Sequence, residues 1–349
     1  MEDGRGRTLP VYYASGPNGR TFPLLKTMLT SACERDCLYC AFRAGRDMRR
    51  ATFRPEEMAG VFLDLHRAGV VEGLFLSTGI LRGGANTQNR LLDTAEILRH
   101  RLGFTGYLHL KIMPGAERGQ IARAMQLANR VSINLEAPNA ARLHHLAPHK
   151  DFESELLLPL GWMHAIRSEA DQRLASSATQ FVVGAAGESD VEILFTTASL
   201  YRAAGLARVF FMVFQPCPGT PLESHPPESP QREHRLYQAS YLLRDYGFDL
   251  EDLPLDKDGH LPREKDPKSA WAEMSLREDP IELNTAPRER LIRVPGIGPS
   301  TADRLIHARR ETKVRDLSQL RALGIVAERA APYIILDGSR PPHQRSSLL

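Results

Sequence analysis

Three cysteines near the N-terminus have the spacing of a metal-binding loop. Cys33, Cys37 and Cys40 form a C-x3-C-x2-C pattern directly after a predicted strand. Thiolates spaced in this way can hold three irons of a cubane iron–sulfur cluster and leave the fourth iron without a protein ligand. An open metal position is typical of sites that do chemistry, whereas structural sites are closed. A structural zinc site is the alternative, but no fourth ligand lies nearby in the sequence.

This cysteine motif resembles the signature of the radical S-adenosylmethionine (SAM) superfamily. The family places C-x3-C-x2-C after its first strand, usually with an aromatic residue before the third cysteine, and Tyr39 fits that position. The resemblance implies a [4Fe-4S] cluster on Cys33, Cys37 and Cys40, with SAM chelating the open iron. It also implies reductive cleavage of SAM to a 5′-deoxyadenosyl radical, which abstracts hydrogen from a substrate.

The same resemblance implies further cofactor-binding positions besides Tyr39. Gly79 lies where the family often has a Gly-Gly-Glu-Pro segment, although the glutamate is missing here. Asn134 and Glu136 lie where some members place a ribose-binding strand end. Gly184 begins a segment similar to the glycine-containing one that approaches SAM after the fifth strand. Each glycine could equally be part of a simple turn.

Three residues are candidates for a catalytic role. Cys217 lies in a proline-rich turn after the last predicted strand, where it could donate a hydrogen atom, ligate a metal, or merely fill the turn. His109 and Lys111 lie on one face of a predicted strand. The sequence does not distinguish among these candidates.

The elements that must position these residues follow a β-then-α rhythm from about residue 23 to 248. Such a rhythm favours a parallel sheet with right-handed crossovers. Six units are two short of a closed (β/α)8 barrel, so we expect a partial (β/α)6 TIM-like barrel, with a doubly wound sheet as the alternative. The predicted strands are Leu24–Thr30, Gly73–Thr78, Tyr107–Met113, Val131–Glu136, Gln180–Val183 and Val209–Gln215. The predicted helices are Pro55–Ala68, Asn89–Arg101, Arg118–Ala128, Ser154–Ser168, Asp190–Ala203 and Gln231–Tyr246.

Two of these strands alternate between polar and apolar residues. His109 and Lys111 share one face of their strand, and Asn134 and Glu136 share one face of the next. A parallel strand covered by helices on both faces would be apolar throughout. We therefore expect these four side chains to line a wet internal cavity with the cluster at its mouth. An antiparallel sheet with one face in water is the alternative.

The rest of the chain suggests a second, small all-α domain. Pro295, Gly296, Ile297 and Gly298 separate two short helical patterns and resemble the turn of a helix-hairpin-helix motif. We expect positive φ at these glycines and expect their amides to contact a phosphate. Arg293 and Arg304 would add charge. The predicted divisions are 1–22 (N-terminal extension), 23–248 (radical SAM core), 249–280 (linker or irregular lobe), 281–338 (helix-hairpin-helix) and 339–349 (disordered tail).

Charge and composition indicate the partners. The chain has 349 residues, of which 42% are hydrophobic and 25% charged, as in ordinary globular proteins. Residues 281–349 contain 12 Lys and Arg but only 7 Asp and Glu, which favours a nucleic-acid partner for this part. No secretory signal or membrane-spanning run is visible, so a reducing, cytoplasmic location is expected.

A barrel combined with such a tail resembles the radical SAM proteins linked to uracil-DNA glycosylase, which are described as DNA modification or repair enzymes. The resemblance implies DNA as substrate, an electron donor such as flavodoxin or ferredoxin, and a uracil-DNA-glycosylase-like partner. The alternatives are a radical SAM enzyme acting on RNA or, like biotin synthase, on a small molecule. A further alternative is a non-catalytic iron–sulfur protein that binds nucleic acid.

Overall fold

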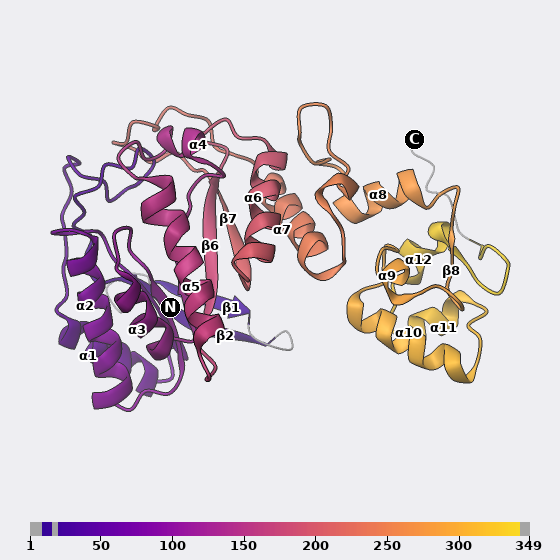
Figure 1. Ribbon diagram of the computed structural model, residues 1–349, viewed down its shortest axis with the longest axis horizontal. Coiled ribbons are helices and arrows are strands. Elements are labelled where there is room, and N and C mark those ends of the chain that lie inside the picture. Colours follow the sequence, from indigo (N-terminus) through magenta and orange to yellow (C-terminus); the bar gives the residue numbers. More distant parts are fainter. Residues whose placement is uncertain (1–8, 16–19, 343–349) are drawn as a thin grey trace. The chain divides into compact units, whose positions relative to one another are not determined.

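The computed structural model describes residues 9–15 and 20–342, and the chain divides into two compact units (Figure 1). The first unit comprises the chain up to Glu188 together with Ser199–Glu228. The second comprises Ser189–Ala198 and the chain from Ser229 onward. The second unit thus begins earlier than the predicted boundary at 248, and the predicted domain limits stay predictions. The predictions for 1–8 and 343–349 lie outside the described residues.

The first unit is built on a curled half-barrel sheet. Within the described residues, seven strands form this sheet in chain order, and every neighbouring pair is parallel except β1 with β2. The prediction of a partial barrel with parallel strands is therefore confirmed, and the antiparallel alternative is wrong. The strands are β1 (Val11–Ser15), β2 (Thr21–Met28), β3 (Gly73–Ser77), β4 (Tyr107–Lys111), β5 (Arg130–Ser132), β6 (Ser176–Val183) and β7 (Arg208–Val213).

Helices connect the parallel strands, as the sequence predicts. Neighbouring helices pack side by side, α1 against α2, α2 against α3, and α3 against α5. Two of the helical segments contain a π-helical turn, η2 (Ile97–Arg101) after α2 and η3 (Phe152–Leu157) before α5. The helices are α1 (Pro55–Arg67), α2 (Gly84–Glu96), α3 (Arg118–Leu127), α4 (Ala140–His144), α5 (Leu158–Glu169), α6 (Asp190–Ala203) and α7 (Pro230–Asp245).

The two faces of the sheet differ in polarity, as the alternation predicts. Leu74, Leu76, Leu108 and Leu110 are fully buried on one face, where the helices lie. The opposite face, called here the inner face, carries polar and partly exposed residues from every parallel strand, among them Lys26, Phe75, Lys111, Arg130 and Gln180. Because a sheet covered on both faces would be apolar on both, the inner face is the one left for a ligand.

β5 is shorter than the predicted strand Val131–Glu136 because the chain bulges after Ser132. The Thr179 hydroxyl bridges the bulge: it donates to the Ile133 carbonyl at 2.8 Å and accepts from the Leu135 amide at 3.1 Å. The backbone returns to β6 at Glu136, whose amide donates to the Gln180 carbonyl at 3.0 Å. Bulges re-aim side chains next to functional sites, and this one re-aims Glu136.

The second unit has its own hydrophobic core. Buried side chains from Ala272 to Leu336 form one continuous cluster, which contains Leu291, Leu305 and Leu320 at its centre. Its short strands β8 (Ile281–Glu282) and β9 (Ile334–Ile335) pair in parallel. Its remaining helices are η4 (Leu250–Asp252), α8 (Pro267–Ser275), α9 (Arg288–Leu291), α10 (Pro299–Glu311), α11 (Leu317–Ala322), α12 (Ala327–Ala330) and η5 (Ala331–Tyr333).

The predicted hairpin glycines differ in conformation, which corrects one expectation. Gly296 has φ of +84°, and a Cβ there would lie 2.4 Å from the Val326 carbonyl oxygen. Gly298 has φ of −101° and is the N-cap of α10, so the expectation of positive φ at Gly298 is wrong. The hairpin therefore requires glycine at position 296, since only that position is left-handed and crowded.

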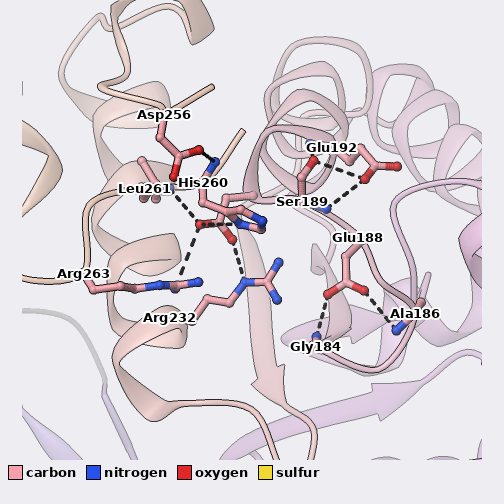
Figure 2. A network of polar contacts seen from close by, with 11 residues as sticks. Gly184, Ala186, Glu188, Ser189, Glu192, Arg232, Asp256, His260, Leu261 and Arg263 are labelled. Carbon is pink, nitrogen blue, oxygen red and sulfur yellow. Dashed lines mark hydrogen bonds and ion pairs between the residues drawn. The ribbon is translucent and has the colours of Figure 1, made fainter. Parts of the chain in front are cut away.

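A buried carboxylate organises the segment between α7 and α8. Asp190 is fully buried, and its carboxylate lies 2.7 Å from Arg232 Nε and accepts the Leu261 amide at 2.9 Å. His260 and Arg263 approach the same carboxylate at 3.6 and 4.0 Å (Figure 2). Asp190 is therefore one of the side chains that fix the predicted linker segment within the second unit, together with the pairs of Asp252 with Arg293 and of Asp266 with Arg329.

Candidate active site

The loop after β2 carries the three cysteines at the carboxyl end of the parallel strands, where α/β barrels place their chemistry. The Ile80 amide donates to Cys33 Sγ at 3.4 Å, and the Phe42 amide donates to Cys40 Sγ at 3.4 Å. Hydrogen bonds of this kind to cluster sulfurs tune iron–sulfur centres. The loop therefore already offers two of its thiols the donors that a bound cluster needs.

Arginines hold the cysteine loop in shape rather than facing solvent. Arg50 donates to four backbone carbonyls, at 2.7 Å to Ser31, 2.8 Å to Phe42, 2.8 Å to Arg43 and 3.3 Å to Arg46. This saturates both terminal nitrogens with loop oxygens that would otherwise lack partners. Arg50 thus works as an internal brace of the loop.

Gly79 allows the loop after β3 to reach the cysteine loop. A Cβ at Gly79 would lie 2.2 Å from the Ala32 carbonyl oxygen and 3.1 Å from Cys33 Cβ. The Gly79 amide donates to the Thr30 carbonyl at 2.8 Å. In this structure Gly79 packs one loop on the other, and its predicted contact with SAM stays a prediction.

The three thiols are close enough to influence one another. Burial raises the pKa of the Cys37 thiol to about 11, Lys150 opposes this, and Cys40 and Cys33 add to it. Burial likewise raises the pKa of Cys40. Thiols in such surroundings ionise readily only when a metal supplies positive charge.

The donor set fits a cubane better than a single ion. Among residues 9–15 and 20–342, no group of three or more His, Cys, Asp and Glu is arranged to hold one metal ion. In a cubane each cysteine binds a different iron, so the thiols need not converge on one point. Three thiols in one loop, with amide donors at two of them, meet the requirement for three corners of a [4Fe-4S] cluster.

A buried polar network lies beside this loop and is centred on Glu136. Its carboxylate accepts Lys150 Nζ at 3.0 Å and Asn134 Nδ2 at 3.4 Å, and it also bonds the Tyr39 hydroxyl. Lys111 donates to the Asn134 amide oxygen. Tyr39, Lys111, Asn134 and Glu136, all predicted site residues, are thus brought together.

Charge coupling within the network fixes the protonation of its members. Burial alone would raise the pKa of Glu136, but Lys150 and Lys111 together hold it below the ordinary value. Burial lowers the pKa of Lys111 to about 7, although Glu136 opposes this. Glu136 is therefore an anion with one firmly charged partner, Lys150, and one that can lose its proton near neutrality.

Glu136 also has a strained backbone, with φ of +66°. A left-handed conformation is uncommon for a residue other than glycine, asparagine or aspartate and clusters at functional sites. Here it follows directly from the bulge, because the chain must turn back to β6 at this residue. The left-handed backbone at Glu136 therefore costs some local stability, and it directs the carboxylate into the network.

No hydrogen bond within the described residues joins the two remaining catalytic candidates, His109 and Cys217. His109 is buried on β4, hydrogen-bonds Ser132 Oγ at 2.8 Å and meets the Phe75 ring edge at a centroid distance of 4.5 Å. Burial, and then the charges around it, hold the pKa of His109 well below its ordinary value. Cys217 lies in the turn after β7, and no hydrogen bond in the described part of the chain joins it to His109 or Lys111.

Gly184 takes part in a loop that closes on a buried acid. It has φ of +95°, and its amide donates to Glu188 Oε1 at 2.5 Å. The Ala186 amide donates to Glu188 Oε2 at 3.1 Å, so one side chain organises the whole turn (Figure 2). The predicted SAM contact of Gly184 stays a prediction.

Two of the residues predicted to bind nucleic acid, Arg293 and Gly298, already make hydrogen bonds within the second unit. Arg293 lies 2.8 Å from Asp252 and donates to the Gly247 carbonyl at 2.7 Å. The Gly298 amide donates to Thr301 Oγ1 at 2.7 Å. Arg304 is exposed at the surface of α10.

Sequence reasoning missed Lys150, Arg50 and Glu34. The Glu34 carboxylate accepts the amides of Arg82 and Gly83, both at 2.9 Å, and so ties the cysteine loop to the loop before α2. Lys150 lies more than a hundred positions from the cysteines and only the fold brings it near. No local pattern marks these residues, apart from the run of arginines that contains Arg50.

No protein-family model and no curated protein matches this sequence, but solved structures do. The FeFe-hydrogenase maturase HydG from Carboxydothermus hydrogenoformans is 15% identical, with a TM-score of 0.52, over 63% of this chain and 51% of that one. Methylornithine synthase (PylB) is 18% identical, with a TM-score of 0.49, over 63% of this chain and 61% of that one. A radical SAM methyltransferase from Sphaerobacter thermophilus is 15% identical, with a TM-score of 0.48, over 67% and 75%.

These comparisons concern the fold. The chain spans 51% of HydG and 61% of PylB, less than two thirds of either. The similarity to HydG, at 15% identity, shows a shared fold over 63% of this chain, and the first unit is an α/β half-barrel. Within residues 9–15 and 20–342, no helix is both long and apolar enough to cross a membrane.

Proposed function

We propose that this protein is a radical SAM enzyme. Cys33, Cys37 and Cys40 would hold a [4Fe-4S] cluster. When reduced by one electron, such a cluster would cleave SAM reductively to a 5′-deoxyadenosyl radical. The observation that carries the proposal is the position of the C-x3-C-x2-C loop at the carboxyl end of β2, beside the buried Glu136 network.

The residues of the chain have separable roles in this proposal. Glu136 and Asn134 present a carboxylate and an amide to the ribose hydroxyls of SAM, and Lys150 keeps Glu136 ionised. Tyr39 and Gly79 bound the same region from the cysteine loop and from the loop after β3. An external reductant such as flavodoxin or ferredoxin would deliver the electron.

Anaerobic reconstitution tests the cluster. The wild type is expected to bind about four irons per chain and, with dithionite and SAM, to release 5′-deoxyadenosine. Alanine at Cys33, Cys37 or Cys40 should abolish both, whereas Cys217→Ala should retain the iron. Stoichiometric zinc with no iron would contradict the proposal.

The finer part of the proposal is that the substrate is nucleic acid, with DNA as the first candidate. The support is the net positive charge of residues 281–349 and a pocket of about 290 Å3 beside the hairpin. Gly296, Gly298, Lys268 and Arg329 are among the residues that line this pocket. Asp266 also lines this pocket and pairs with Arg329 at 2.7 Å, and the Gly298 amide donates to Thr301 Oγ1, so a phosphate would compete with these partners. A phosphate contact carries no sequence information.

Binding of oligonucleotides to the full-length protein tests this part. Affinity for DNA should fall steeply with salt and depend weakly on sequence. Arg304→Gln should weaken binding and lower the salt slope by about one, whereas Arg310→Gln, at the far end of α10, should not. Preference for RNA, or no salt-sensitive binding, would transfer support to the RNA or small-molecule readings. A uracil-DNA-glycosylase-like partner stays a prediction.

A further inference from the structure

The inner face of the half-barrel carries two cations, Lys26 and Arg130, in one row of residues on the N-terminal side of the Glu136 network. Strand register places Lys26, Phe75, His109 and Arg130 side by side on β2, β3, β4 and β5. Since Cα partners in register share a face, all four side chains belong to the inner face. Lys26 is exposed, and Phe75 and Arg130 are partly exposed, so a ligand can reach the row.

The described residues supply no counter-charge to Lys26 or Arg130. Among the described residues, no carboxylate forms an ion pair with Lys26 or Arg130. Arg130 makes one hydrogen bond, from Nε to Ser176 Oγ at 3.1 Å, which leaves its two terminal nitrogens for another acceptor. Lys26 Nζ lies 5.6 Å from the centre of the Phe75 ring. Glu136, the acid of the neighbouring network, is already paired with Lys150.

The positive charges near the row affect the buried imidazole of His109. After burial, the charges of Lys111, Arg130 and Lys26 all lower the pKa of His109. Two of these groups, Lys26 and Arg130, belong to the row, whereas Lys111 belongs to the Glu136 network. An anion bound between Lys26 and Arg130 would offset the repulsion between their charges, because opposite charges a few ångströms apart attract each other.

We propose that the inner face binds an anionic group of the substrate, a phosphate or a carboxylate, between Lys26 and Arg130. Arg130 offers a planar fork that suits bidentate contacts with either group, and Lys26 adds a mobile point charge. The ring of Phe75 between them offers an apolar surface for the part of the substrate that carries the anion. The word substrate here rests on the proposed function, but the binding of an anion does not.

Calorimetric titration of the full-length protein at low salt tests the proposal. The probes are inorganic phosphate, pyrophosphate and malonate, so that the phosphate and carboxylate arms are separate. One class should bind saturably, and Arg130→Gln and Lys26→Gln should each weaken it about tenfold or more, as for the loss of a hydrogen bond to a charged group. Arg118→Gln, on α3 and half exposed in an ion pair with Glu169, is the matched control and should bind as the wild type.

A second readout reports the site itself. Bound anion should raise the imidazole pKa of His109, measured by NMR, in the wild type but not in Lys26→Gln. The Lys26 side chain is exposed, so its replacement should leave the fold intact. Equal affinity in all four proteins, or no saturable binding, would overturn the proposal. If the wild-type protein binds the anion but does not cleave SAM, the result counts against the proposed function and not against the anion site.

Discussion

The Glu136 carboxylate and the Lys150 ammonium form an ion pair at 3.0 Å in which both side chains are almost inaccessible, 5% and 10% exposed. The pair joins the end of the β5 bulge to the segment after α4. Because each charge is taken out of water, each depends on the other for its stability.

We predict that breaking this pair destabilises the first unit strongly. Lys150→Met leaves Glu136 without its main partner and should lower the free energy of unfolding by about 3–5 kcal/mol. The double change Glu136→Gln with Lys150→Met should cost less than the sum of the single changes, because neither charge is then left alone. Denaturant unfolding of the four proteins measures this coupling, and additive costs would contradict it. Glu136→Ala should in addition weaken SAM binding in equilibrium dialysis.

We predict that Arg50 determines how well the cysteine loop keeps its iron. A lysine cannot reach four carbonyls in fixed directions, so Arg50→Lys should leave the fold intact but lower the iron retained after reconstitution. Arg49→Lys is the control, since Arg49 is exposed next to it in the chain. Iron content and circular dichroism decide the matter, and equal iron retention in both variants would refute the bracing role.

We predict opposite effects for two glycine-to-alanine changes. Gly79→Ala forces the Ala32 carbonyl away and should destabilise the protein by about 1–3 kcal/mol while loosening the cysteine loop. Gly60→Ala, within α1 and with no atom within 4 Å of the new Cβ, should stabilise it by about 0.5–1 kcal/mol. Thermal unfolding of both variants measures whether each change lowers or raises the stability of the protein. A stabilising Gly79→Ala would show that the loops are not in contact.

We predict that stability depends on pH through Lys268. Burial, and then Arg329, lower the pKa of Lys268 to about 7 from the ordinary 10.5, with Asp266 opposing. Between these two values the unfolded chain binds the extra proton, so the free energy of unfolding should rise with pH, by up to about 1.4 kcal/mol per pH unit. Lys268→Met should remove that rise, and Lys257→Met, at an exposed turn, should retain it. Unfolding midpoints between pH 7 and 10 check the sign.

Local patterns in the sequence were enough for the architecture of the first unit. Alternation of His109 and Lys111 with leucines identified the two faces of β4, because side-chain direction in a strand has a period of two. The cysteine spacing located the loop, because its three thiols are neighbours in the chain. β1 was missed, since it is a short antiparallel edge strand outside the β-then-α rhythm.

What the sequence could not predict depends on contacts between distant residues. Nothing near Lys150 indicates that it meets Glu136, and the left-handed backbone of Glu136 follows from a bulge bridged by Thr179 on another strand. The two hairpin glycines looked equivalent in the sequence. They differ because a Cβ at Gly296 would lie 2.4 Å from the carbonyl oxygen of Val326, thirty positions later, whereas a Cβ at Gly298 would have its nearest neighbour at 3.5 Å.

Arg46 donates to the Ala41 carbonyl in the cysteine loop and to the Pro218 carbonyl in the turn after β7, both at 2.7 Å. The loops that follow the first and the last parallel strand are therefore clasped by one side chain. An open half-barrel gains in this way, at its carboxyl end, a mechanical continuity that a closed barrel obtains from strand pairing. We therefore expect a displacement of the cysteine loop to move the turn that carries Cys217, 177 positions along the chain from Cys40.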